Sequence, residues 1–322
     1  MRLSLALAAA LVLVSATALR AQHYHDPAPA GLVTLDLATR ARAERQLDEV
    51  RAATARFQDH AVAVADGYKR FEPGPGEPLM GEHWYRQDLV LEPLDLTQPS
   101  TLIYAPIGGE WQLVAIAYTV YQRPGEPLPE GFAGDSDRWH VHDVAGLVRV
   151  ALSDRPVARW VVERRLERGP IGRLAGTTDL VMLHAWIGTD NPDGVFANRN
   201  VALPYARSGL PTAWAEPGNE AAARGVTLSL PGACDGQFAA LDRMAKLEPT
   251  QETAIRAGCE AAAVEVTDAV GSALPDADSA DASVSLNTVA ARAWRGYELT
   301  IASELTREQG ERIAALLATT RH

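Results

Sequence analysis

Four histidines stand at positions where their spacing could support chemistry. His140 and His142 are two residues apart in Trp-His-Val-His, His184 lies in Leu-His-Ala-Trp, and His83 precedes Trp84. On a β-strand, side chains at i and i+2 point to the same face, so His140 and His142 would project together about 7 Å apart. Two imidazoles on one strand and a third from a neighbouring strand can form the first coordination shell of a transition metal.

We therefore predict a metal site built from His140, His142 and His184, with His83 as fourth ligand or close neighbour and Glu82 as the remaining donor. The three ring nitrogens are expected to converge within about 4 Å of each other. Neutral imidazole suits Zn, Cu, Fe and Ni, so the expected cofactor is a divalent transition metal of this set. The alternative for each histidine is a strand residue hydrogen-bonded to a backbone carbonyl, with the nearby tryptophans filling the core.

The sequence carries no motif that names a reaction. It contains no Gly-x-Ser-x-Gly elbow, no phosphate-binding glycine-rich loop and no His-Glu-x-x-His. The leading hypothesis is a binding or structural protein with a histidine-built metal site, and no catalytic residue is assigned. One alternative is a metal-dependent hydrolase or oxidoreductase in which Glu82 or Asp143 is the general base. Another is a metal-free module whose tryptophan-rich surface binds a partner or ligand.

A long helix and a mainly antiparallel sheet are the elements that must position the histidines. Apolar residues at helical spacing predict a helix from Asp36 to about Tyr68, which the prolines and glycines of residues 71–78 end. Strands are expected at residues 101–105 and 111–121, joined by a Gly108-Gly109 turn, and around residues 139–150 and 180–187. Residues 156–166 could form a strand or a short helix.

The C-terminal part of the chain is predicted to be helical. Residues 204–232 are rich in proline and glycine and are expected to form a linker. Helices expected at residues 237–247, 250–274 and 286–317 would make a three-helix bundle. The predicted fold class is thus α+β, a long N-terminal helix packed on a mainly antiparallel sheet at residues 22–203, followed by an all-α helical bundle at residues 233–322.

The first 21 residues indicate export. Arg2 precedes an apolar run over residues 3–14, and Leu19-Arg20-Ala21 fits a cleavage site, as in a signal peptide. The alternative, an uncleaved anchor, is disfavoured because the run is shorter than the ~20 residues that span hydrocarbon. The expected location is periplasmic or extracellular.

The cysteine count agrees with an oxidising compartment. Cys234 and Cys259 are the only cysteines, and an even number in an exported chain favours one disulfide between neighbouring helical segments. Two buried thiols or a redox pair are the alternatives.

Charge excludes one class of partner. The 322 residues carry 30 Lys plus Arg against 41 Asp plus Glu, a net charge of −11, and no stretch is basic enough to bind a phosphate backbone. We expect no nucleic-acid partner and no membrane span after cleavage of residues 1–21. A small ligand or protein partner is left undefined.

Several of these motifs also resemble those of a family. Met-Gly-Glu-His-Trp at residues 80–84, Trp-His-Val-His at 139–142 and Leu-His-Ala-Trp at 183–186 are similar in order and spacing to those of an uncharacterised family of secreted bacterial proteins, over residues 45 to 200. The resemblance implies that the histidine cluster is a shared site. This chain lacks the cysteine expected where Leu147 and Val148 stand, and it adds the helical segment after residue 232.

The signal-peptide hypothesis predicts where the mature chain begins. We expect mass spectrometry of protein taken from the host envelope to give a first residue at Gln22 or within one or two residues of it. An intact Met1 in the mature, soluble fraction would contradict export by cleavage.

Overall fold

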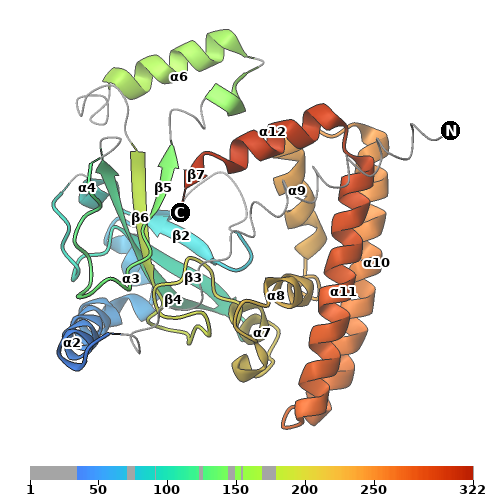
Figure 1. Cartoon of the computed structure of the whole chain (residues 1–322), viewed down its shortest axis with the longest axis horizontal. Coiled ribbons are helices and arrows are strands. Elements are labelled where there is room, and N and C mark those ends of the chain that lie inside the picture. The colour runs from blue at the N-terminus through green and yellow to red at the C-terminus, as the bar shows by residue number, and fades with distance from the viewer. Residues whose placement is uncertain are drawn as a thin grey trace. The chain divides into compact units, whose positions relative to one another are not determined.

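The computed structural model describes residues 35–70, 77–90, 92–122, 126–143, 149–153, 155–168 and 179–321 (Figure 1). The predicted signal peptide lies outside these residues. The described chain divides into two compact units, one containing residues up to Asn200 together with Thr319–Arg321, the other comprising Val201–Ala318. We call them the sheet unit and the helical unit. The fold class is α+β, as the sequence predicts.

The N-terminal helix of the sheet unit is interrupted. The helices here are α2 (Leu37–Thr54), the 3₁₀ turn η3 (Ala55–Gln58), α3 (His60–Ala65), α4 (Gln87–Val90) and α6 (Pro156–Arg168). The Asp36 side chain caps α2 by accepting from the backbone of Ala38 and Thr39. Asp59 has extended backbone angles and caps Ala61, so it ends one helix and begins the next. The single helix predicted from Asp36 to Tyr68 is therefore wrong in its continuity.

All strand pairs of the sheet are antiparallel, in the order β1-β2-β3-β4-β6-β5-β7. The strands are β1 (Lys69–Arg70), β2 (Glu82–Tyr85), β3 (Thr101–Ile107), β4 (Glu110–Gln122), β5 (His140–Asp143), β6 (Asp179–Ala185) and β7 (Thr320–Arg321). Gly108 and Gly109 have φ values of 62° and 85°, which only glycine adopts readily, and they make the predicted turn between β3 and β4.

Two predictions for individual segments are settled by the structure. Residues 156–168 form the helix α6 and not a strand. The strand predicted around residues 139–150 is confirmed only for β5, because residues 149–151 are helical.

One face of the sheet packs against α2, η3 and α3 and forms the core of this unit. The core joins Leu47, Val50 and Phe57 of the helices to sheet residues such as Leu102, Tyr104, Ile116, Tyr118, Val181 and Leu183. The Tyr104 hydroxyl donates to the Phe57 carbonyl at 2.7 Å, which fixes the helices over the sheet. Since strand side chains alternate, the residues between these core positions project from the opposite face.

The helical unit contains more helices than the predicted bundle of three. It consists of α7 (Leu203–Arg207), η5 (Thr212–Trp214), α8 (Glu220–Thr227), α9 (Ala233–Ala245), α10 (Pro249–Ala273), η6 (Leu274–Asp276), α11 (Ala280–Glu304) and α12 (Arg307–Leu317). The predicted helix over residues 286–317 is two helices. Thr306 has extended backbone angles, and a capping box with Gln309 starts α12.

Residues 204–232 are not a linker but part of the helical core. At Gly225 of α8, an added Cβ would lie 2.1 Å from the Ala290 carbonyl oxygen, so the two backbones pack directly on each other. The buried Tyr205 hydroxyl donates to Asn287 at 2.6 Å, and Asn287 donates to the Trp214 carbonyl at 2.9 Å. The helices α7 and α8 are only 5 and 8 residues long and stand among prolines and glycines, which explains why the sequence pattern indicated a loop.

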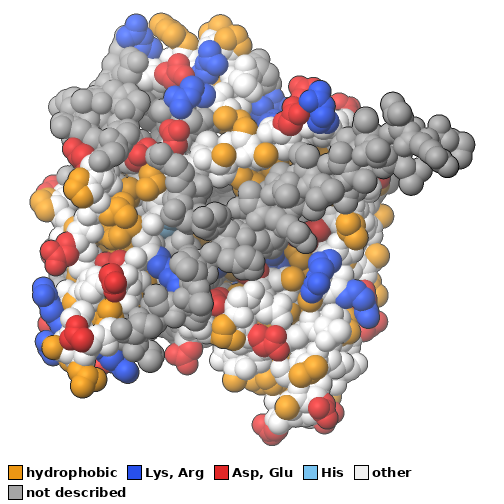
Figure 2. Space-filling view, viewed as in Figure 1, with side chains coloured by type: hydrophobic (Ala, Val, Ile, Leu, Met, Phe, Trp, Pro, Cys, Tyr) orange, Lys and Arg blue, Asp and Glu red, His pale blue; other side chains and the backbone are white. Residues whose placement is uncertain are grey.

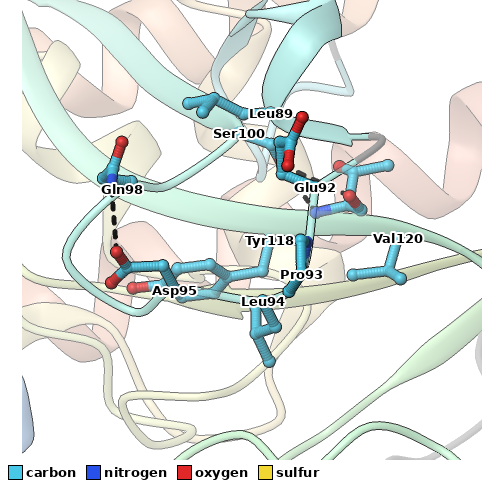
Figure 3. Close-up of a pocket in the computed structure, with 10 residues that line it drawn as sticks. Leu89, Glu92, Pro93, Leu94, Asp95, Gln98, Ser100, Tyr118 and Val120 are labelled. Atoms are coloured by element: carbon cyan, nitrogen blue, oxygen red, sulfur yellow. Dashed lines mark hydrogen bonds between the residues drawn. The ribbon is translucent and has the colours of Figure 1, made fainter.

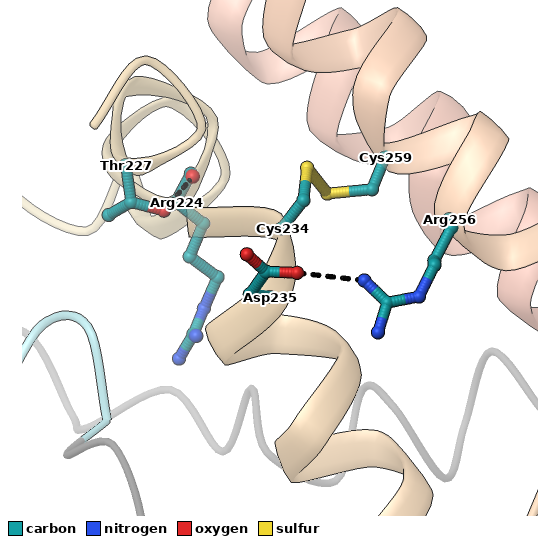
Figure 4. The surroundings of a disulfide bond; sticks show 6 residues. All are labelled: Arg224, Thr227, Cys234, Asp235, Arg256 and Cys259. Atoms are coloured by element: carbon teal, nitrogen blue, oxygen red, sulfur yellow. Dashed lines mark hydrogen bonds and ion pairs between the residues drawn. A yellow bond between two sulfur atoms is a disulfide. The ribbon is translucent and has the colours of Figure 1, made fainter. Parts of the chain in front are cut away.

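The predicted disulfide is present in the helical unit. Cys234 of α9 and Cys259 of α10 are bonded, with their Cα atoms 5.8 Å apart (Figure 4). The Arg256 guanidinium donates to Asp235 at 2.8 Å and lies 4.1 Å from the centre of the Phe238 ring. The covalent bond, the ion pair and the cation–π contact together hold α9 on α10.

Charges are interspersed over the face shown in Figure 2, where Lys and Arg side chains alternate with Asp and Glu among the described residues. In the same described part of the chain, none of the helices is long and apolar enough to cross a membrane.

The disulfide gives a stability prediction. Reduction of the Cys234–Cys259 bond should lower the free energy of unfolding by roughly 3 kcal/mol, because the unfolded chain regains the freedom of a loop of 25 residues. Chemical denaturation with and without a thiol reductant, with Cys234→Ser/Cys259→Ser as control, measures the difference. The double variant should have the same free energy of unfolding as the reduced wild-type protein, and the reductant should not change that value. A change on adding reductant to the double variant would contradict the assignment.

Candidate functional site

Strand register places the predicted histidines on one face of the sheet. In the β5–β6 pair, His140 lies opposite Met182 and His142 opposite Leu180. Residues opposite each other in an antiparallel pair share a face, and so do residues two apart on one strand, so His184 of β6 projects from this face too. We call it the histidine face; it is the face turned away from the helices α2 and α3.

His83 reaches the same place from the far side of the sheet. It lies on β2, opposite Ile103, and two strands separate it from β6. A flat sheet would keep β2 and β6 about 14 Å apart. The two side chains lean toward each other across this distance, and β4 presents only the small Ala115 and Ala117 between them. The Nε2 atoms of His83 and His184 are 3.5 Å apart.

The other two imidazoles continue the row. The centre of the His184 ring lies 5.1 Å from that of His140, which lies 4.9 Å from that of His142. His140 packs on His142 edge to face, with 77° between the ring planes. The structure thus brings all four predicted histidines together, although they come from three strands.

The predicted convergence of three ring nitrogens is not found. Among the described side chains, no set of three or more His, Cys, Asp or Glu is arranged to hold a metal ion. The edge-to-face packing of His140 on His142 is the physical reason, because it turns a ring edge toward a ring face instead of directing two lone pairs at one point. The pair within ligand spacing is His83 and His184.

A backbone contact sets the tautomer of His184. Its Nδ1 lies 3.1 Å from the carbonyl oxygen of Asn198, which can only accept a hydrogen bond. Nδ1 therefore carries the ring proton, and the Nε2 lone pair points toward His83. The segment that supplies this carbonyl is held in place because Trp186 donates its indole N–H to the Ala197 carbonyl at 2.6 Å.

Burial keeps both imidazoles of the pair neutral. It lowers the pKa of His83 to about 4, with a further lowering by His142 that a backbone hydrogen bond to Gly81 and the charge of Glu77 oppose. Burial also holds the pKa of His184 well below its usual range, and His83 adds to that effect. At neutral pH the two rings are in the form that ligates metals.

Sequence reasoning missed two residues beside the histidines. The Met182 thioether sulfur lies 3.2 Å from His184 Nε2, and its position two residues before His184 on a predicted strand was the signal that could have found it. Glu77, which precedes β2, affects the pKa of His83 and forms an ion pair with Arg199 at 3.5 Å.

The two carboxylates predicted as ligand or general base lie on the other face of the sheet. Glu82 is adjacent to His83 and so points away from it, and it forms an ion pair with Arg70 at 2.7 Å. Asp143 alternates with His142 in the same way and forms an ion pair with Arg149 at 3.5 Å. The sequence prediction erred because both residues were chosen by closeness along the chain.

A separate cavity of about 440 Å³ lies between the 89–100 segment and β4 (Figure 3). Its polar groups are used within the protein: Asp95 accepts from Gln98 at 2.8 Å, Tyr118 donates to the Leu96 carbonyl at 2.6 Å, and the Ser100 hydroxyl accepts from the Thr119 backbone at 2.7 Å. These groups hold the 89–100 segment on the sheet, so the histidine face remains the better candidate site.

Comparison with known proteins does not assign the site. The chain matches no protein-family model, no curated protein and no solved structure.

The buried histidines predict a loss of stability in acid. Because the pKa of His83 is about 4 in the folded protein and about 6.5 when unfolded, the unfolded chain binds a proton that the folded chain does not. The contribution of neutral, buried His83 to the free energy of unfolding is therefore fully present above pH 6.5. It is lost as the pH falls toward 4, by at most about 1.4 kcal/mol per pH unit. Urea denaturation of metal-free protein between pH 7.5 and 4.5 measures it. His83→Gln should have a shallower pH dependence, and identical slopes would contradict the assignment.

Proposed function

We propose that this protein is an exported binding protein whose histidine face holds a transition-metal ion. One observation carries the proposal, the 3.5 Å distance between the Nε2 atoms of His83 and His184. Two nitrogens bound to one ion at about 2.0–2.1 Å, with an angle near 115–120° at the ion, stand at this separation. In metal-bound imidazoles the N–H of the nitrogen that does not bind the metal commonly donates a hydrogen bond to a carbonyl. The Nδ1–H of His184 makes this contact with the Asn198 carbonyl.

A simple hydrogen bond is the competing explanation of the same contact. If His83 carried its proton on Nε2, it would donate to the lone pair of His184, and the pair would be a structural feature of the core. If the pair binds metal, the purified protein should retain metal that depends on His83 and His184. If the contact is only a hydrogen bond, it should not. The contact of His184 Nδ1 with the Asn198 carbonyl favours metal, because it directs the Nε2 lone pair of His184 toward His83.

The enzyme alternative has less support. It needs a general base beside the ion, and both residues predicted for that role, Glu82 and Asp143, project from the opposite face. The carboxylate beside His83, Glu77, is engaged in an ion pair with Arg199 at 3.5 Å. Export is supported by the disulfide, because such bonds persist in oxidising compartments. The resemblance to secreted bacterial proteins stays a prediction.

Metal analysis tests the proposal directly. After exposure to Zn(II), Cu(II), Ni(II), Fe(II) and Cu(I) in turn and extensive dialysis, the full chain should retain about one equivalent of at least one metal. His83→Ala and His184→Gln should lose it, because each removes one of the two nitrogens. His60→Gln is the matched control, since His60 packs on Trp84 and Tyr104, on the opposite face. Equal metal content in wild type and the two cluster variants would overturn the proposal.

A further inference from the structure

A thioether beside the imidazole pair narrows the choice of metal. The Met182 sulfur lies 3.2 Å from the same His184 Nε2 that faces His83. We propose that the ion is copper in its +1 state, bound by His83, His184 and Met182. This inference rests on the proposed metal-binding function and adds the identity and oxidation state of the metal.

The softness of the donors is the first argument. Thioethers are soft ligands that select Cu(I), whereas Mg, Ca and Mn prefer carboxylate and carbonyl oxygens, and tetragonal Cu(II) and Ni(II) favour nitrogen and oxygen. With nitrogen bonds of about 2.0 Å and a sulfur bond of about 2.3 Å, the 3.2 Å contact corresponds to an angle near 95° at the ion. Together with the angle near 115–120° between the nitrogens, this suits three-coordinate Cu(I).

Charge is the second argument. A thioether carries no charge and an imidazole binds a metal in its neutral form, so His83, His184 and Met182 form a neutral ligand set. His184 is fully buried. A charge in such surroundings is costly unless it is compensated, and the cost rises steeply with the charge. The nearby Glu77 is paired with Arg199 at 3.5 Å, so its charge is already compensated. Glu82 and Asp143 project from the opposite face, and both cysteines are held in the disulfide of the helical unit. A neutral ligand set therefore accommodates Cu(I) better than a divalent ion.

Access is the third argument. Met182 and His83 are half-buried, whereas His184 is fully buried. The Asn198 carbonyl fixes the orientation of His184. An ion held by the two half-buried side chains thus meets an imidazole that is already oriented.

Competition with a chromophoric Cu(I) chelator tests the inference on the full chain. The assay is anaerobic, with ascorbate as reductant and no thiol, so that the Cys234–Cys259 bond stays intact. Met182→Leu should weaken Cu(I) binding about ten-fold or more and leave Zn(II) binding within about two- to three-fold, because leucine keeps the volume and removes the soft donor. Met244→Leu, at a half-buried methionine of α9, is the matched control and should behave as wild type.

Each outcome separates this inference from the proposed function. Metal binding that needs His83 and His184 but is unchanged by Met182→Leu would overturn the Cu(I) assignment and leave the metal-binding function standing. Absence of metal binding in wild type would overturn both. If Met182→Leu fails to fold, copper X-ray absorption on the wild-type protein decides: we expect one sulfur scatterer near 2.3 Å, and a first shell of nitrogen and oxygen alone would refute the inference.

Discussion

Antiparallel pairing of β6 with β4 on one side and β5 on the other is the constraint on which the site depends. This register aligns His140 with Met182 and His142 with Leu180, while Val181 stays between Val120 and Val141. Side chains alternate between faces with a period of two, so a slip of one residue would turn the imidazoles toward α2 and move the core valines to the opposite face. The hydrophobic core on one face thus enforces the position of the histidines on the other.

The second requirement is that a side chain of β2 reaches a site on β6, although β3 and β4 lie between these strands. Small Ala115 and Ala117 on β4 leave the space through which His83 and His184 meet. Burial then lowers the pKa of both rings, which keeps their lone pairs available at neutral pH. The approach of the two rings brings their nitrogens together, and their burial keeps these nitrogens unprotonated. Both effects favour a pair of neutral nitrogen donors.

The helical unit is stabilised in a different way. Small residues let α8 approach α11 at Gly225 and Ala290, and the Tyr205–Asn287 hydrogen bond lies buried within the same unit. Such backbone-to-backbone packing excludes side chains and relies on many short contacts. The disulfide adds a covalent restraint between α9 and α10.

The sequence alone determined the fold class, the β3–β4 turn, the disulfide pair and the shared face of His140 and His142, because these depend on local composition, on glycine conformation or on alternation along one strand. The same alternation places Glu82 and Asp143 on the face opposite their neighbouring histidines. Only the tertiary structure decided that His83 on β2 meets His184 on β6, two strands away, and that residues 204–232 belong to the helical core. The first depends on strand order and register across the sheet. The second depends on how two short helices, α7 and α8, pack within the helical unit. Neither kind of information is present in the spacing of residues along the chain.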